Sequence, residues 1–390
     1  MKNLKLLSAA VACSFILLTG CQKEADSTVA PTAAQSSTQL STITPERIQQ
    51  LRASLPAGLE QRLRERSALL LKTDPQYRDL VRRAIAADPT CDDDTRVNQW
   101  LDQQLADWNN EVITYVLDFA MLDLPTYDAL VFENSSQGQR FGVNGEYTQQ
   151  LTKSFKDLQR FWNIPSDDIV LAAMHGNMLL DRDKVMRTYI AVFEVDPATA
   201  AALADIVVEL ADVIPQYRDG NHPIFTFNAF ALEGFNFPPY GNIPDKIIMG
   251  DGIMEAFTSI GYGDVAPQAI LAHEFGHQIQ FNLNLFGTET SPEATRRTEL
   301  MADAYSAYYL SHARGAAMQW RRVQQFLQVF FNIGDCGFTN PGHHGTPTQR
   351  MAAAEWGYSV ANDAQKQGHI LTSQEFTRLF ERQLPQLLNR

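Results

Sequence analysis

The pattern His273-Glu274-Phe275-Gly276-His277 constrains the fold of this 390-residue chain more than any other feature of its sequence. Pro267 suits the first turn of a helix, and the residues after it supply an apolar face: Ile270, Leu271, Phe275 and Ile279. Residues four apart share a helix face, so both imidazoles can reach one metal ion. Glu274 is rotated about 100° from His273, where it can hold a water molecule beside the ion. The segment therefore predicts a helix that carries part of a metal site.

A second predicted helix supplies the rest of this site. Ser291-Pro292-Glu293 is a helix start, and on the helix that follows Glu299 and Asp303 lie four residues apart on one face. The combined pattern H-E-x-x-H and E-x-x-x-D resembles the gluzincin branch of zinc metallopeptidases. The resemblance implies that His273, His277 and Glu299 bind one zinc ion, and that Asp303 orients a ligand imidazole, that of His273.

The same resemblance implies a reaction. Zinc would lower the pKa of a water molecule and polarise the scissile carbonyl, while Glu274 acts as the general base. Two other metal sites are excluded. A metzincin needs His-x-x-Gly-x-x-His, whereas residues 277–283 read His-Gln-Ile-Gln-Phe-Asn-Leu. A di-iron carboxylate site needs a second Glu-x-x-His motif, which the chain lacks.

Three further segments bear on this resemblance. The stretch 342–347, with Arg350 after it, is similar to the C-terminal signature of neutral zinc metallopeptidases and of CAAX-protease-like membrane-associated zinc endopeptidases. It implies that His344 stabilises the oxyanion, the alternative being a capping histidine, and that Arg350 holds the loop through a salt bridge. Residues 228–231 resemble a motif just upstream of the zinc helix in the membrane-associated group, and with residues 246–249 they would give an edge strand to which an extended peptide adds. Residues 252–256 echo G-x-M-E-N of zinc aminopeptidases without the final Asn.

The N-terminus indicates export. Residues 1–5 are basic and residues 6–18 apolar but too short to span a bilayer, so residues 1–20 are predicted to be a signal peptide. Leu18-Thr19-Gly20-Cys21 resembles the lipobox of bacterial lipoproteins, which implies lipid on Cys21 and residues 21–43 as a flexible tether. The alternative is an ordinary secretory signal with a chance cysteine. In a Gram-negative host, Gln22 favours the outer membrane, facing the periplasm.

Cysteines and charge narrow the setting further. Cys91 and Cys336 remain after export and lipidation, and in an oxidising compartment they form either one disulfide or two free thiols. Acidic residues outnumber basic ones by 45 to 32, giving a formal charge of −13, and no long basic run offsets it. This balance argues against nucleic acid as a partner.

The predicted fold is α+β and mainly helical. A helical region over 44–220 precedes a zincin-like metallopeptidase domain over 221–390 with a small mixed or antiparallel sheet. Strands are predicted at 169–173, 187–195, 224–230 and 246–249, and helices at 94–122 and 196–217.

The function expected from these features is zinc-dependent hydrolysis of peptide bonds, in proteins or peptides of the cell envelope. An endopeptidase is favoured. A zinc aminopeptidase and a zinc-bound scaffold or chaperone that hydrolyses nothing are the alternatives. The expected partners are a peptide or protein substrate and, through lipid, a membrane.

Overall fold

A computed structural model describes residues 45–70, 95–287, 291–332 and 345–389 of the chain. Residues from Thr42 to Arg390 form one compact unit. The described part is mainly helical and includes a small mixed sheet of three strands, so the predicted helical content and mixed sheet are confirmed. No described helix is both long enough and apolar enough to cross a membrane.

The first half of the chain contributes mostly helices. Their bounds are α1 Pro45–Ser54, α2 Leu59–Leu70, α4 Arg96–Gln104, α5 Asn110–Asp118, α6 Leu124–Phe132, α7 Thr148–Phe161, α8 Arg182–Ala191 and α9 Pro197–Val213. Short 3₁₀ helices occur at Gly176–Leu180, Pro215–Tyr217 and Pro223–Thr226. The predicted helix over 196–217 is confirmed as α9 followed by the second of these 3₁₀ turns.

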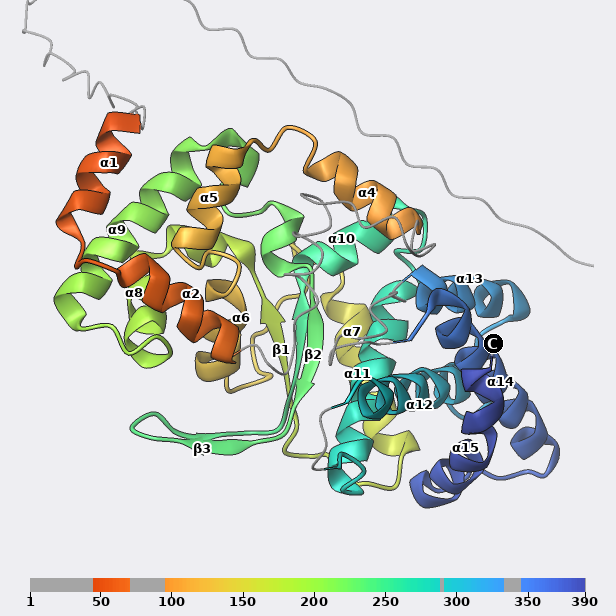
Figure 1. Cartoon of the computed structure of the whole chain (residues 1–390). Helices are drawn as coiled ribbons and strands as arrows, with labels where there is room; N and C mark the ends of the chain where they lie inside the picture. Colours follow the sequence, from red (N-terminus) through yellow and green to blue (C-terminus); the bar gives the residue numbers. More distant parts are fainter. Residues whose placement is uncertain (1–44, 71–94, 288–290, 333–344, 390) are drawn as a thin grey trace, which may run out of the picture. The chain divides into compact units, whose positions relative to one another are not determined.

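The sheet crosses the boundary predicted near residue 220. β1 (Val170–Met174) pairs in parallel with β5 (Lys246–Gly250), and β2 (Ala229–Leu232) pairs antiparallel with the other side of β5. Every residue of β1 and β5 is buried, as expected of short apolar runs in a sheet that is covered on both faces. β2 lies at one edge of this sheet (Figure 1). A separate ladder joins β3 (Phe235–Phe237) to β4 (Gly241–Ile243).

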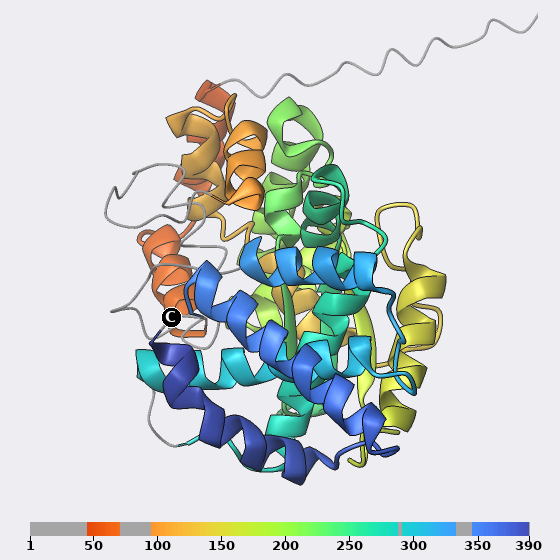
Figure 2. The same cartoon turned by 90° about the vertical axis from the view of Figure 1, so that its right-hand side faces the viewer.

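In the described ranges after β5 the structure contains six helices: α10 Asp251–Ser259, α11 Ala266–Asn282, α12 Pro292–Ser311, α13 Trp320–Asn332, α14 Pro347–Lys366 and α15 Ser373–Leu388. The N-terminus of α12 is capped by Ser291, and that of α14 by a capping box of Thr346 with Gln349. α11 is buried on nearly every side, against α7, α12 and β2, and α12 is covered in turn by α14 (Figures 1 and 2). The helices that carry the conspicuous motifs are therefore the central helices of this half.

Three predicted elements are wrong in detail. The helix predicted over 94–122 divides into α4 and α5, because the Asn109 side chain caps a new helix by accepting from the N–H groups of Glu111 and Val112. The strand predicted at 187–195 is mostly the last turns of α8, whose cap is Asp181. The strand predicted at 224–230 is a 3₁₀ turn followed by the start of β2. The strands predicted at 169–173 and 246–249 are confirmed as β1 and β5.

Candidate metal centre

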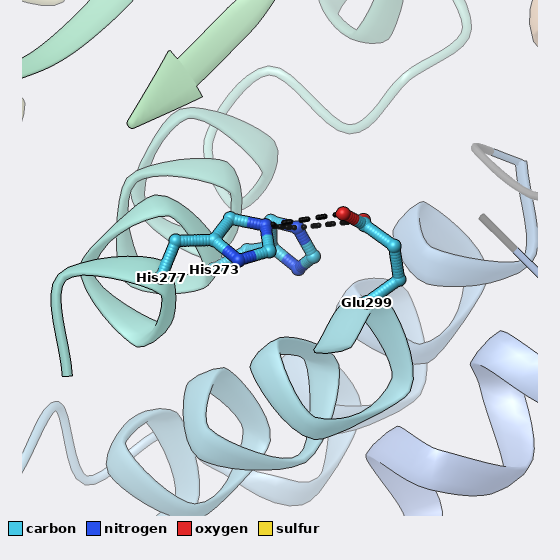
Figure 3. A group of neighbouring side chains, drawn as sticks. All are labelled: His273, His277 and Glu299. Carbon is cyan, nitrogen blue, oxygen red and sulfur yellow. Dashed lines mark hydrogen bonds and ion pairs between the residues drawn. The ribbon is translucent and has the colours of Figure 1, made fainter. Parts of the chain in front are cut away.

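Three buried side chains from two helices converge on one point. His273 and His277 come from successive turns of α11, and Glu299 comes from α12 (Figure 3). The two Nε2 atoms are 3.1 Å apart. That of His273 lies 3.3 Å from Oε2 of Glu299, and that of His277 lies 3.3 Å from Oε1. Among the described ranges this is the one group of three histidine, cysteine, aspartate or glutamate side chains that could hold a metal ion.

Hydrogen bonds on the far side of each ring determine which nitrogen faces the centre. The Nδ1 atom of His273 lies 2.8 Å from Oδ1 of Asp303, and that of His277 lies 2.8 Å from Oε1 of Gln280. The amide nitrogen of Gln280 donates to the carbonyl of Thr298 at 2.7 Å, which leaves its oxygen to accept. Both Nδ1 atoms therefore carry a proton, which leaves Nε2 of each ring as the nitrogen that can bind a metal ion once it is unprotonated.

This arrangement favours a cation. When both Nε2 atoms are unprotonated, their lone pairs 3.1 Å apart repel one another, and the Glu299 carboxylate adds negative charge beside them. In that state a positive ion at the centre would be attracted to all three groups. Sequence reasoning did not identify Gln280, although its position three residues after His277 places it on a neighbouring part of the same helix face.

A third helix completes the support of the site. Arg350, in the first turn of α14, donates to both oxygens of Asp303, from Nε at 2.8 Å and from Nη2 at 2.7 Å. Both side chains are buried, with Arg350 1% and Asp303 0% exposed. The Nη2 atom also lies 3.5 Å from Oε2 of Glu299. Arg350 thus forms a salt bridge whose partners, Asp303 and Glu299, are acidic residues of α12; the predicted role in holding the 342–347 loop stays a prediction, because residues 342–344 lie outside the described part of the chain.

The acidic side chains dominate the electrostatics of the centre. Burial alone would lower the pKa of His273, but its hydrogen bonds to Asp303 and Glu299 outweigh burial and raise that pKa. Glu274 is also buried, at 5% exposure. When ionised, the carboxylates of Glu274, Glu299 and Asp303 carry three negative charges, against the one positive charge of Arg350, which contacts Glu299 and Asp303. Two negative charges remain, which a divalent cation would neutralise.

Several predicted site residues fall outside the described part of the chain. These are His344, Cys21, Cys91 and Cys336. The structure therefore gives no geometry for the predicted oxyanion histidine, the lipid attachment or the disulfide.

Comparisons of the chain with protein-family models, with curated proteins and with solved structures find no match. The case for a function consequently rests on the buried His273, His277 and Glu299 group and its surroundings.

Proposed function

We propose that this chain is a zinc-dependent peptidase with the gluzincin arrangement of ligands. The observation that carries the proposal is the spacing of the three ligand atoms. Tetrahedral ligands at about 2.05 Å from Zn²⁺ lie about 3.3 Å from one another. The Nε2 atoms of His273 and His277 are 3.1 Å apart, and the two carboxylate oxygens of Glu299 lie 3.3 Å from them, Oε2 from His273 and Oε1 from His277. One ligand atom from each residue can therefore be chosen so that all three lie within 4.8 Å of one another. Two neutral imidazoles and one carboxylate are also a donor set that zinc prefers in catalytic sites.

The residues around this group have roles that follow from their contacts. His273, His277 and Glu299 would hold the ion, and Asp303 and Gln280 keep the two rings turned toward it. Bound zinc would supply Lewis acidity, activating a water molecule and polarising a carbonyl group. Glu274, one residue after His273 on the same helix, would accept the proton of the attacking water and deliver it to the leaving amine.

The position of β2 supports a polypeptide substrate. β5 occupies one side of β2, and among the described strands none pairs with the other side. β2 packs against α11, and Gln278, next to His277, donates to the carbonyls of Leu232 at 3.2 Å and of Lys246 at 2.7 Å. An extended peptide could add to this free edge through backbone hydrogen bonds, close to the proposed metal ligands. A binding edge of this kind accepts the middle of a chain, which favours an endopeptidase over an aminopeptidase.

The proposed setting is the cell envelope. Lipid on Cys21 would anchor the chain to a membrane, in the outer membrane facing the periplasm if the host is Gram-negative. This part of the proposal rests on the lipobox resemblance alone, because Cys21 lies outside the described residues.

The decisive experiment measures zinc content and peptide-library cleavage on the same protein samples. Glu274→Gln should retain about one zinc per chain and lose roughly 100-fold or more of the activity, because an amide cannot accept the proton. Glu299→Ala should lose zinc, because it removes one of three protein ligands. Zinc should raise the unfolding temperature of the wild type and of Glu274→Gln but not of Glu299→Ala.

The matched control is Glu355→Gln, which makes the same chemical change on the exposed surface of α14. It should change neither zinc content nor cleavage. A Glu299→Ala protein with full zinc would exclude the proposed ligand set. A fully active Glu274→Gln protein would exclude Glu274 as the general base. A zinc-loaded wild type that cleaves no peptide would contradict the peptidase proposal and favour the zinc-bound scaffold or chaperone.

A further inference from the structure

The edge formed by β2 continues into β3. Two residues separate β2 from β3, and two residues separate β4 from β5, so the two ladders form one long, interrupted hairpin. Leu232 pairs with Lys246 on one side of the interruption, and Phe235 pairs with Ile243 on the other. At the interruption, the carboxylate of Asp245 accepts the N–H of Gly234 at 2.6 Å.

As a result, β2 and β3 each have one edge that pairs with no other described strand, and these two edges are consecutive. β5 and β4 occupy the inner side of the hairpin, so the outer sides of β2 and β3 follow one another along the chain. The β3–β4 part extends beyond the three-stranded sheet (Figure 1). From Ala229 to Phe237 the strand advances by eight residues, or about 26 Å at the usual rise of an extended chain.

The β3–β4 part carries exposed aromatic rings. Phe235 is 40% and Tyr240 39% exposed, which places both among the large apolar side chains most open to solvent. Phe237 lies between them, 5.9 Å from the ring of Phe235 and stacked at 5.5 Å on that of Tyr240. Phe132, at the end of α6, meets the edge of Tyr240. We name these four residues the aromatic hairpin cluster.

The composition of the segment indicates the chemistry of its partner. Residues 234–244 contain no charged side chain, although 20% of the residues in the chain are charged. A two-stranded ladder of three residues per strand is marginally stable by itself, and its aromatic rings gain most when an apolar partner covers them. Because residues 234–244 carry no charge, this segment can form no ion pair with a ligand.

We propose that the aromatic hairpin cluster is an accessory binding surface for apolar side chains of an extended, unfolded polypeptide. The inference rests on the proposed function, since it assumes that a peptide adds to the outer edge of β2. A strand that occupies this edge near His277 and continues past Leu232 reaches β3 next. The preferred substrates are therefore unfolded protein segments with aromatic or aliphatic residues about four to eight positions from the scissile bond, rather than short peptides.

The test compares a short and two long peptides around one cleavable sequence taken from the library. The short peptide has six blocked residues, and the long ones add an apolar or a polar flank of eight residues. The combined variant Phe235→Ser and Tyr240→Ser should raise KM for the apolar long peptide by roughly 10-fold and leave cleavage of the short one unchanged. Leu180→Ser, which changes another exposed apolar side chain (36%), is the control and should change neither.

Binding is measured separately from turnover, by fluorescence anisotropy of the labelled long peptides on zinc-loaded Glu274→Gln protein. The apolar peptide should bind roughly 10-fold more tightly than the polar one, and the two serine substitutions should abolish the difference. Equal binding of the apolar peptide with and without these substitutions would overturn the inference. The inference would also be overturned if the two serine substitutions instead abolished flotation of the protein on phosphatidylcholine vesicles, or its self-association in size-exclusion chromatography.

These outcomes separate the inference from the proposed function. If no peptide is cleaved but apolar binding still depends on Phe235 and Tyr240, the binding surface stands and the peptidase proposal fails. If the short peptide is cleaved normally and the serine substitutions have no effect on the long one, the peptidase proposal stands and the aromatic hairpin cluster has no part in substrate binding.

Discussion

The buried pair of Arg350 and Asp303 offers the sharpest test of how the site is supported. We consider Asp303→Ala, Arg350→Met and the double variant. The two side chains are 0% and 1% exposed and share two hydrogen bonds of 2.8 and 2.7 Å, so water cannot replace either partner when the other is removed. Breaking a buried ion pair by deleting one partner costs about 3–5 kcal/mol of unfolding free energy.

The two single changes should differ in a way that the contacts predict. Arg350→Met leaves Asp303 with its remaining hydrogen bond to His273, so its cost should lie near the lower value, about 3 kcal/mol. Asp303→Ala removes the hydrogen bonds of 2.8 and 2.7 Å from the guanidinium and also releases the ring of His273, so its cost should lie near the upper value, about 5 kcal/mol. The double variant removes both members of the ion pair together, so its cost should fall short of the sum of the two single costs by about 2–3 kcal/mol.

The measurement is urea-induced unfolding in the presence of a chelator, so that bound metal does not contribute. If Asp303→Ala does not fold, the double variant should still fold better than it. The exposed pair of Lys153 and Asp157 on α7 serves as the control cycle, because Lys153 is 78% exposed and its coupling should stay below about 0.5 kcal/mol. Costs at Arg350 and Asp303 that add to within about 0.5 kcal/mol would refute the coupling argued here.

Two other predictions concern pH and location. His222 is buried and accepts the N–H of Ile224 on Nδ1, and burial lowers its pKa to about 4, so unfolding frees it to take a proton. Stability should therefore fall as the pH drops from 7 to 4.5, by about 2 kcal/mol more in the wild type than in His222→Asn, and equal losses in urea unfolding would contradict this. Cys21→Ala, exported with another secretory signal, should move the protein from membranes to the soluble fraction; a variant that still pellets with membranes after a salt wash would argue against lipid anchoring through Cys21.

Local sequence patterns were sufficient where the structure depends on local physics. The period of a helix alone predicts that His273 shares a face with His277, and Glu299 with Asp303. Burial of short apolar runs alone predicts β1 and β5. The strand predicted at 187–195 is wrong because β-branched content is a weaker signal there than the helix cap at Asp181, which starts α8. The long helix predicted over 94–122 failed because its apolar spacing concealed the second cap at Asn109.

The contacts that sequence patterns missed are long-range ones. Arg350 and Asp303 are 47 residues apart, and a predicted salt bridge at Arg350 did not name its partner. The hydrogen bond from Gln280 to the Thr298 carbonyl likewise connects α11 with α12. Such contacts depend on how helices pack, which no single segment encodes.

Helix packing also sets the distances within the proposed metal centre, and small residues make that packing possible. A Cβ atom on Gly276 would lie 3.0 Å from Cα of Ala302, so the absence of a side chain lets α11 and α12 approach closely beside His277 and Glu299. A Cβ atom on Gly357 would lie 2.3 Å from the carbonyl oxygen of Ala304, which allows α14 equally close to α12. Glu299 and Asp303 therefore lie between two helices. α11 brings the imidazoles close to them, and α14 brings the guanidinium of Arg350. The motif residues supply the chemical groups, and Gly276 at the contact of α11 with α12 allows the 3.3 Å separations between the imidazoles and Glu299 on which the proposed metal binding depends.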